Sequence, residues 1–456
     1  MKDHEIKLIY SEEGVSETIG YSLILAIVLV AVGVLVVIAY PIQSNIQDTA
    51  FIESQIQALT MLDGRISSVA LGSSPSQLTR INLNGGTMYV RNYSDNYLNI
   101  TVTNQTGYSI TIFNKTLGLI EYKLGENRLI YENGGMFRVY PNGESVMLSP
   151  PEFYFNGETL TFPVIRLDNS ASVGGKGTIS VMARSGEEKK IIYPDLSSNF
   201  LMNPIYGKQI KIRLKSDNYK AWGRYIEERT DAVPLTNDVT KEVVVSFNSK
   251  PSEGPVELKV PIEVFGLDTT NSTPLTQFKF NLTGVGSNLN MMLRAPESDS
   301  EIFSIQIKKA TGVGEEGVVV YVNYNNGGAN ESWFANKLAL ITTADTATVD
   351  LLNASVNSKY NTNDLSVTWE NETPPLYNKT YIKNDGETVP INVVMQHYMK
   401  LVSPTGTFSI YSGTKTSDKW DGFNATNSTY TLSYSIMPPN INYLHIVDHA
   451  VNVTLS

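Results

Sequence analysis

Residue types with acid–base or metal chemistry are scarce in this chain, and one group of them is clustered. His445, Asp448 and His449 lie within five positions, and a helix would bring both histidines to one face, as a zinc site requires. The segment follows Pro438-Pro439 and continues into the alternating Val451–Leu455, which predicts an extended edge strand instead. In a strand the two histidines would stand about 13 Å apart, too far to bind one metal ion. We therefore expect no catalytic zinc site here.

A second acidic group alternates as a calcium-binding loop does. Glu297, Asp299 and Glu301 occupy the positions of the first three acids of such a loop. Ile302 replaces the glycine of that loop, however, and Lys308 replaces its bidentate acid. A solvated acidic turn is the expected interpretation, with calcium binding as the alternative.

The composition of the 456 residues narrows the function classes further. There are no cysteines and only 4 histidines, which excludes thiol catalysis and leaves little material for acid–base chemistry. Lys+Arg 35 against Asp+Glu 45 gives a formal charge of -10, so we expect no nucleic-acid partner. Nucleophile-elbow and phosphate-loop motifs are absent from the sequence. We expect a non-enzymatic protein without a cofactor; an anchored hydrolase that uses carboxylates is the enzyme-class alternative.

The most informative segment is an uncharged apolar stretch near the amino terminus, Ile19–Tyr40. A helix of this length would span about 33 Å, enough for the apolar core of a bilayer of about 30 Å. No second stretch of this kind follows, so the chain would cross a membrane once. Lys2 and Lys7 precede the stretch, and Arg65 is the first basic residue after it, which predicts a head outside the cell.

The predicted helix continues beyond the membrane, from Ser16 to Leu71. Apolar residues recur at steps of mostly three and four after Pro41, which is expected to kink the helix. Gly72 and Pro75 would end it. The face formed by Ile56, Leu59, Leu62 and Ile66 is expected to cover a sheet of the head.

From Ser73 onward, short alternating segments separated by Asn-Gly and Asp-Gly turns predict a mainly β, sandwich-like head of one or two domains. Two short helices are expected, at Ser216–Thr230 and Ile391–Val402. We divide the chain into 1–14 (leader), 15–72 (apolar, then amphipathic helix), 73–240 (first β-rich domain, with the helix near 216–230) and 241–456 (second β-rich region). The predicted strands are Thr87–Arg91, Leu98–Val102, Tyr108–Phe113, Met136–Tyr140, Thr159–Leu167, Glu242–Phe247, Val256–Phe265, Gln277–Leu282, Phe303–Lys308, Val318–Tyr324 and Thr429–Ile436.

Asn-x-Ser/Thr sequons follow the apolar stretch in about twice the number that chance would give, which predicts a glycosylated exterior. A further sequon at Asn371 is discounted because a proline follows its threonine. The alternative is an accident of an Asn- and Thr-rich composition. The candidate sites are Asn92, Asn99, Asn104, Asn114, Asn271, Asn281, Asn330, Asn353, Asn378, Asn424, Asn427 and Asn452.

The segment Glu13–Gly20 (EGVSETIG) resembles the amino-terminal segment of archaeal type IV pilins and archaellins. The resemblance implies that a prepilin-type peptidase cuts between Gly14 and Val15, leaving the apolar helix on the mature protein. It also implies assembly with like or related pilin subunits, with Glu17 beside a neighbour's terminal amine. Small residues that would let such helices approach closely are Gly20, Ala26, Ala31 and Gly33.

Two other fates of the stretch remain open from the sequence. It could be a permanent signal anchor that is never cut, or a conventional signal peptide cut after Ala39. The anchored alternative gives a monomeric surface protein or adhesin. Trp333, Phe334 and Trp420 could stack on sugars in such a protein, although a place in the core is the expected role, and its surface ligand is unknown.

The head resembles an uncharacterised archaeal family of pilin-like surface proteins along most of its length. That resemblance implies a single-pass membrane protein with an extracellular head, as a subunit or minor component of a pilus-like filament, and it implies no chemical activity. The segments that carry it are Tyr131–Arg138, Ser149–Phe155, Thr159–Leu167, Tyr219–Thr230 and Ile441–Ile446.

Overall fold

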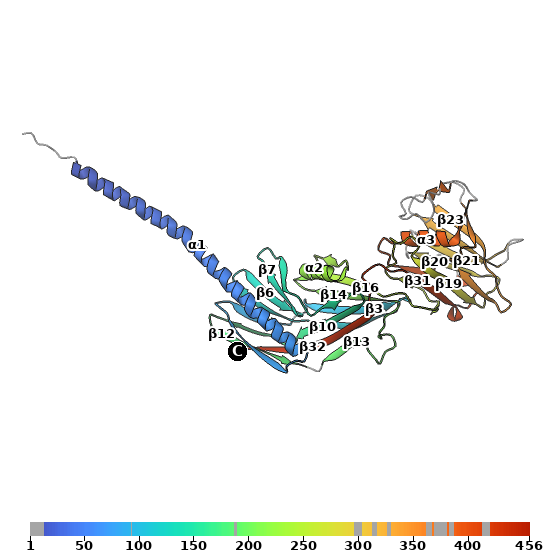
Figure 1. Cartoon of the computed structure of the whole chain (residues 1–456), viewed down its shortest axis with the longest axis horizontal. Helices are drawn as coiled ribbons and strands as arrows, with labels where there is room; N and C mark the ends of the chain where they lie inside the picture. The colour runs from blue at the N-terminus through green and yellow to red at the C-terminus, as the bar shows by residue number, and fades with distance from the viewer. Residues whose placement is uncertain are drawn as a thin grey trace, which may run out of the picture.

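The chain forms one long helix followed by a head of two lobes that lie in a row (Figure 1). The computed structural model describes residues 13–92, 94–186, 189–295, 303–311, 317–325, 330–361, 367–368, 381–382, 387–412 and 420–456. The side chains of 13–18, 39–49, 367–368 and 381–382 are not described. The described part is mostly β-strand with an apolar amino-terminal helix, as the sequence predicts.

The helix α1 spans Glu13–Ala70, 58 residues, and continues through Pro41. The expected kink therefore does not interrupt the helix. Its carboxyl end has the hydrogen bonds of a Schellman-like turn: the Gly72 amide donates to the Val69 carbonyl and the Ser73 amide to the Ser68 carbonyl. Gly72 has a φ of 85°, a left-handed conformation that favours glycine, which explains why the helix ends there.

The first lobe contains three sheets. The β32 sheet runs in the order β1 (Ser76–Asn82), β12 (Thr178–Ser185), β32 (Tyr443–Leu455), β10 (Thr159–Leu167) and β9 (Tyr154–Phe155), and β13 (Lys190–Tyr193) also pairs with β32. The β6 sheet runs β11 (Ala171–Gly174), β2 (Thr87–Arg91), β5 (Leu119–Leu124), β6 (Asn127–Glu132), β7 (Gly135–Val139) and β8 (Ser145–Ser149). The β14 sheet runs β15 (Leu235–Asn237), β16 (Glu242–Asn248), β14 (Lys208–Lys215), β3 (Tyr97–Asn104) and β4 (Ser109–Thr116).

Two hydrophobic cores hold the first lobe together. One lies between α1, the β32 sheet and the β6 sheet, and includes Leu62 and Ile66 of the helix with Val453 of the last strand. The other lies between these sheets, the β14 sheet and the helix α2 (Tyr219–Thr230), and includes Phe137 and Trp222. Both faces of the β6 sheet are therefore covered, one by α1 and the other by the second core.

The second lobe is a sandwich of a short and a long sheet with its own core. The β19 sheet runs β17 (Val256–Glu257), β31 (Thr429–Tyr434), β19 (Leu275–Thr283) and β24 (Thr346–Asp350). The β21 sheet runs β18 (Ile262–Val264), β29 (Phe408–Ser412), β20 (Asn290–Ala295), β21 (Phe303–Lys309), β22 (Val318–Asn325), β23 (Asn330–Ala339), β25 (Asn357–Tyr360) and β28 (Thr388–Pro390), with β30 (Trp420–Asp421) beside β20. The remaining elements are α3 (Ile391–Leu401), η1 (Ala425–Asn427) and the pair β26 (Val367–Thr368) and β27 (Tyr381–Ile382).

The second lobe is inserted into the first, which differs from the expected division at residue 240. β16 pairs with β14, and β32 returns to the first lobe, where it lies parallel to β10 and antiparallel to β12. Residues 241–456 therefore do not form one unit. Sequence position could not indicate this, because the pairing of β32 with β10 joins segments 284 residues apart in register, such as Thr159 with Tyr443.

Candidate functional site

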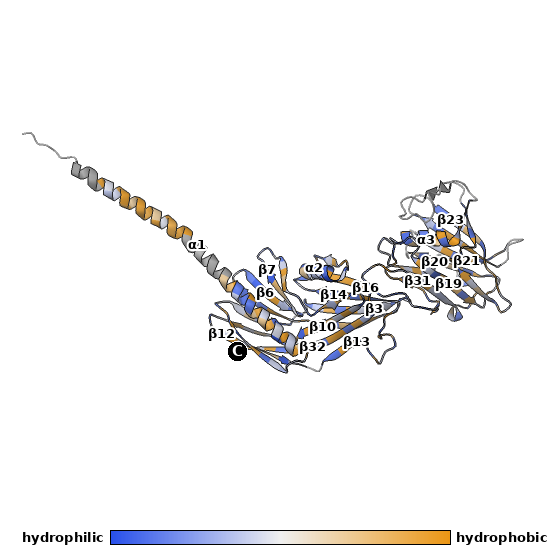
Figure 2. Cartoon of the chain, in the orientation of Figure 1, coloured by the Kyte–Doolittle hydropathy of each residue, from blue (hydrophilic) through white to orange (hydrophobic). Residues whose placement is uncertain are grey.

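The first half of α1 is exposed and apolar on every side. Within Ile19–Ile38, the one described helix long and apolar enough to cross a membrane, large side chains range from 50% exposed at Val28 to 73% at Val37. Figure 2 shows this stretch as a nearly unbroken hydrophobic band that extends away from the head. We call it the apolar segment. Its burial needs lipid or other protein chains, because the head covers none of it.

The expected assembly residues lie in or before this segment. Gly20 is half-buried and Ala26, Ala31 and Gly33 are exposed, and an added Cβ would meet nothing within 4 Å at either glycine. By helix geometry Gly20 and Ala31 lie within about 20° of each other on one face, and Ala26 and Gly33 within about 20° on a second face. Gly14, Val15 and Glu17 lie in the first turns of α1, and their side chains are outside the described set.

The last part of α1, which we call the docked segment (Phe51–Ala70), packs on the head. Ile52, Leu59, Leu62, Ile66 and Val69 are each at most 1% exposed. Two hydrogen bonds from this segment to backbone carbonyls of the head also fix its position. Gln55 Nε2 donates to the Asn82 carbonyl at 2.5 Å, and an Arg65 guanidinium nitrogen donates to the Leu78 carbonyl. The expected burial of the Ile56 to Ile66 face is confirmed, with Ile56 itself partly buried.

A buried carboxylate lies inside this interface. Asp63 is 7% exposed, and Ser149 Oγ of β8 donates to its Oδ2 at 2.8 Å. Burial raises the pKa of Asp63 from 3.8 to about 6, the Ser149 hydroxyl lowers it, and the nearby charge of Glu152 raises it. The docking of α1 therefore contains a group that titrates just below neutral pH.

A second buried carboxylate joins segments that the sequence singled out separately. Glu132 ends β6 and accepts hydrogen bonds from Trp222 Nε1 of α2 at 2.7 Å, Ser216 Oγ at 2.8 Å and Asn96 Nδ2 at 2.9 Å. Burial raises the pKa of Glu132 to about 7, while these donors lower it. The contact ties the β6 sheet to the β14 sheet and fixes α2. Neither carboxylate was predicted as a site, because burial of an acid has no local sequence signal.

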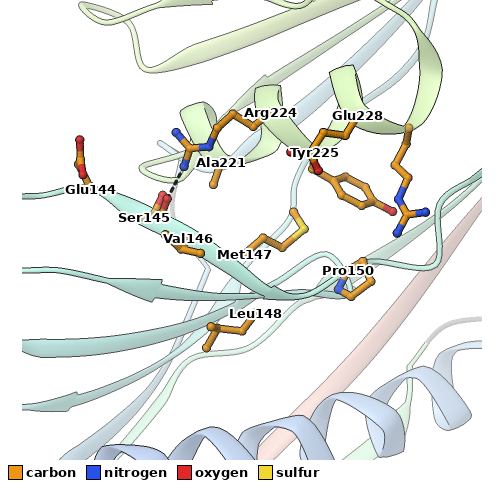
Figure 3. Close-up of a pocket in the computed structure, with 11 residues that line it drawn as sticks. Glu144, Ser145, Val146, Met147, Leu148, Pro150, Ala221, Arg224, Tyr225 and Glu228 are labelled. Atoms are coloured by element: carbon orange, nitrogen blue, oxygen red, sulfur yellow. Dashed lines mark hydrogen bonds between the residues drawn. The ribbon is translucent and has the colours of Figure 1, made fainter. Parts of the chain in front are cut away.

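An open groove lies between α2 and β8, with a volume of about 650 Å³ (Figure 3). Arg224 spans one end of it and donates to the Ser145 carbonyl at 2.6 Å. Met147 and Tyr225 line it, as do the charged side chains of Glu228 and Arg229. The groove presents mixed apolar and charged surface, and no group in it has the arrangement of a nucleophile with its base.

The histidine cluster lies on β32, so the predicted extended conformation is confirmed. The prediction of an edge strand is wrong, because β32 pairs with β10 on one side and with β12 and β13 on the other, partners that are distant in sequence. His445 is exposed and His449 is buried, and burial lowers the pKa of His449 below its usual value. Asp448 is buried and pairs with Arg166 Nε at 2.6 Å and Lys115 Nζ at 2.9 Å. Within the described ranges, no group of three or more His, Asp or Glu side chains could hold a metal ion.

The remaining predicted residues are those of the acidic turn, the three aromatic residues and the sequon asparagines. Glu297, Asp299 and Glu301 lie outside the described residues, as do Asn371 and Asn378. Trp333 is buried in the core of the second lobe, with Nε1 donating to Tyr398 Oη at 2.8 Å; Trp420 and Phe334 are partly buried. The described sequon asparagines are all exposed or half-buried, namely Asn92, Asn99, Asn104, Asn114, Asn271, Asn281, Asn330, Asn353, Asn424, Asn427 and Asn452.

Comparison with known sequences divides the chain near the junction of its lobes. A family of unknown function (DUF7289) matches residues 13–262, and a domain of unknown function (DUF7308) matches residues 263–435. The second match covers nearly the whole inserted lobe. The first includes α1 and all of the first lobe except the returning segment that carries β32.

Related proteins are described only as uncharacterized. One, from Archaeoglobus fulgidus, is 26% identical over 275 residues, covering 50% of this chain and 88% of its own length. Another from the same organism is 19% identical over 243 residues, covering 49% and 85%. The structure of the LG1-3 region of the laminin alpha2 chain aligns with 80% of this chain and 66% of its own, at 8% identity and a TM-score of 0.15, too low to support a shared fold.

Proposed function

The chain belongs to the family of unknown function DUF7289, and we propose that it is a non-enzymatic, pilin-like cell-surface protein held in the membrane by α1. Membership in this family assigns no activity, so the proposal rests on the geometry and on the resemblance of the amino terminus to pilins. In this proposal the protein is a subunit or minor component of a filament related to archaeal type IV pili.

The observation that carries the proposal is the division of α1 into two environments. The apolar segment has a length of about 30 Å, which matches the apolar core of a bilayer. The docked segment belongs to the same unbroken helix and buries one face in the head. A helix of this kind holds the head at a fixed orientation to the membrane. A simple tether would not need the docked segment.

The two faces of small residues on the apolar segment support assembly. Gly20 and Ala31 form one face and Ala26 and Gly33 the other, about 140° apart on the helix. Small residues let helices approach closely in an apolar medium, so one helix could contact two neighbours at once. The partners in this proposal are a prepilin-type peptidase and like or related subunits.

The anchored monomer is the second candidate, and the position of the inserted lobe favours it. The second lobe lies at the end of the head that is farther from α1 (Figure 1). A large lobe held away from the membrane suits contact with a surface ligand and is awkward to repeat densely in a fibre. A minor or tip subunit would present the lobe to a surface ligand without the need to repeat it densely along the fibre.

Glu17 provides the test of assembly. Glu17→Ala should lower the share of protein in filaments while leaving cleavage and head folding unchanged. Glu17→Lys should lower it further, because two cations would meet inside an apolar core. Glu126→Ala, an exposed acid on the head, is the matched control. The measurement compares filament and membrane fractions by quantitative immunoblot. Equal partitioning of all variants would contradict the role of Glu17, and no filament fraction from wild type would favour the monomer.

A further inference from the structure

The two lobes meet at the tip of the β3–β4 hairpin, residues 104–108. The Gln105 carbonyl accepts the Glu263 amide at 2.8 Å and the Tyr430 hydroxyl at 3.3 Å, both from the second lobe. Gln105 Oε1 accepts the Ser252 amide of the connecting loop at 3.1 Å, and the Gln105 residue is 3% exposed. One buried residue of the first lobe is therefore hydrogen-bonded both to the second lobe and to the segment that connects the lobes.

An open groove of about 670 Å³ lies directly beside this junction. One wall consists of Asn104, Thr106, Gly107 and Tyr108 of the first lobe. The other consists of Val256, Glu257 and Lys259, and β17, which contains Val256 and Glu257, pairs with β31 of the second lobe. Whatever fills this groove contacts both lobes at once.

Asn104 is a sequon asparagine on the wall of that groove, and its side chain has a fixed orientation. Its Oδ1 accepts the Thr106 amide at 3.0 Å, the Thr106 hydroxyl at 2.9 Å and the Tyr108 amide at 3.0 Å. Within the described residues, no hydrogen bond uses its Nδ2. Asn271 differs, because its Nδ2 donates to Ser435 Oγ at 3.2 Å. The turn therefore uses the side-chain oxygen of Asn104 and leaves its amide nitrogen available for substitution.

We propose that Asn104 carries an N-linked glycan whose first sugars fill the groove and brace the two lobes. The groove has the chemistry that binds sugars: Tyr108 is 57% exposed and held edge-on by Phe200, with 5.2 Å between ring centroids, and Glu257 forms an ion pair with Lys259. An aromatic face packs on the apolar side of a sugar ring, and the charged pair hydrogen-bonds its hydroxyls.

The attachment step needs an activated glycan on a lipid phosphate carrier and the transferase that uses it, with the glycan and the active site both facing the outside of the cell. Asn104 Nδ2 forms a bond to the anomeric carbon, the anomeric carbon–oxygen bond breaks, and the lipid phosphate leaves with the electron pair. Nδ2 loses one proton in the same exchange. The inference thus depends on the proposed extracellular head, since the substrate is on that side of the membrane.

The test compares protein from native cells with the same chain made in a host that lacks N-glycosylation. Glycopeptide mass spectrometry of native protein should show a glycan on Asn104. Hydrogen exchange of the Glu263 and Ser252 amides should be about tenfold slower in the glycosylated protein, the size of a typical coupling between sites. Thr106→Val should remove the glycan and its protection, whereas Thr106→Ser keeps the sequon and should keep both. Asn114→Gln, on the exposed edge strand β4, is the control for loss of an unrelated glycan.

The outcomes separate the two proposals. Glycans elsewhere but none on Asn104, or a glycan on Asn104 with unchanged exchange at Glu263 and Ser252, would overturn the brace alone. Unmodified asparagines at every sequon, together with a head that external protease cannot reach, would overturn the extracellular placement as well. The native and the unglycosylated protein share one sequence. A difference in hydrogen exchange between them therefore cannot come from loss of the turn around Asn104.

Discussion

The two halves of α1 share one unbroken helix and have opposite surroundings. The apolar segment is at least 50% exposed at every large side chain, whereas the docked segment buries five aliphatic residues to 1% or less. The docked segment keeps polar residues such as Glu53 and Gln57 on its solvent side, and the apolar segment has no polar side. A helix that is hydrophobic all round and uncovered by its own head requires lipid or neighbouring helices. The difference therefore separates the part of α1 that needs lipid or other chains from the part that packs on its own head.

The largest expected effect comes from removing the docked segment. A fragment that starts at Ser73 should be far less stable than one that starts at Pro41. Five buried side chains at about 1.5–3 kcal/mol each sum to on the order of 10 kcal/mol, comparable to the whole stability of a domain. Denaturant unfolding of the two fragments measures the difference. Equal midpoints would mean that the packing of α1 on the head does not stabilise it.

A matched pair of substitutions sharpens the comparison within the full chain. Leu62→Ala in the docked segment should lower the unfolding free energy of the head by about 3 kcal/mol, because it opens a cavity in a closed core. Leu29→Ala in the apolar segment should leave it within about 0.5 kcal/mol. Thermal unfolding in detergent, followed by near-ultraviolet circular dichroism, reports both. A similar loss from each variant would show that the halves are not distinct.

Much of this fold could be predicted from the sequence, since alternation and periodicity are local. The continuous α1, its two environments and the predicted strands follow from hydrophobic spacing alone, although Val256–Phe265 is divided into β17 and β18. Other strands, such as β12 and β14, were not predicted. The return of β32 could not be predicted, because no local signal specifies that Tyr443 pairs with Thr159. The buried acids Asp63 and Glu132 also escaped prediction. Their burial depends on Ser149 and Trp222, residues that only the tertiary structure brings to them.

An effect that shrinks as the pH falls follows from the carboxylate inside the docked interface. The folded-state pKa of Asp63, about 6, lies above its ordinary 3.8. The neutral acid therefore stabilises the fold fully below about pH 4, and this contribution is lost as the pH rises through about 6. Asp63→Asn should raise the unfolding free energy by about 3 kcal/mol at pH 7 and by progressively less below pH 6. Melting temperatures from pH 4 to 8 measure this, with Glu126→Gln as the exposed control. A constant difference across that range would contradict the assignment.

The central claim is that the apolar segment stays on the mature protein and anchors an extracellular head. Terminal sequencing of the protein from native membranes tests it directly, with Gly14→Trp as the matched variant. We expect the mature chain to begin at Val15 and the variant to remain unprocessed but inserted in the membrane. A terminus at Met1 would retain the anchor and favour the monomeric protein. A terminus at Tyr40 would contradict the account, because the apolar segment would then be a discarded signal peptide.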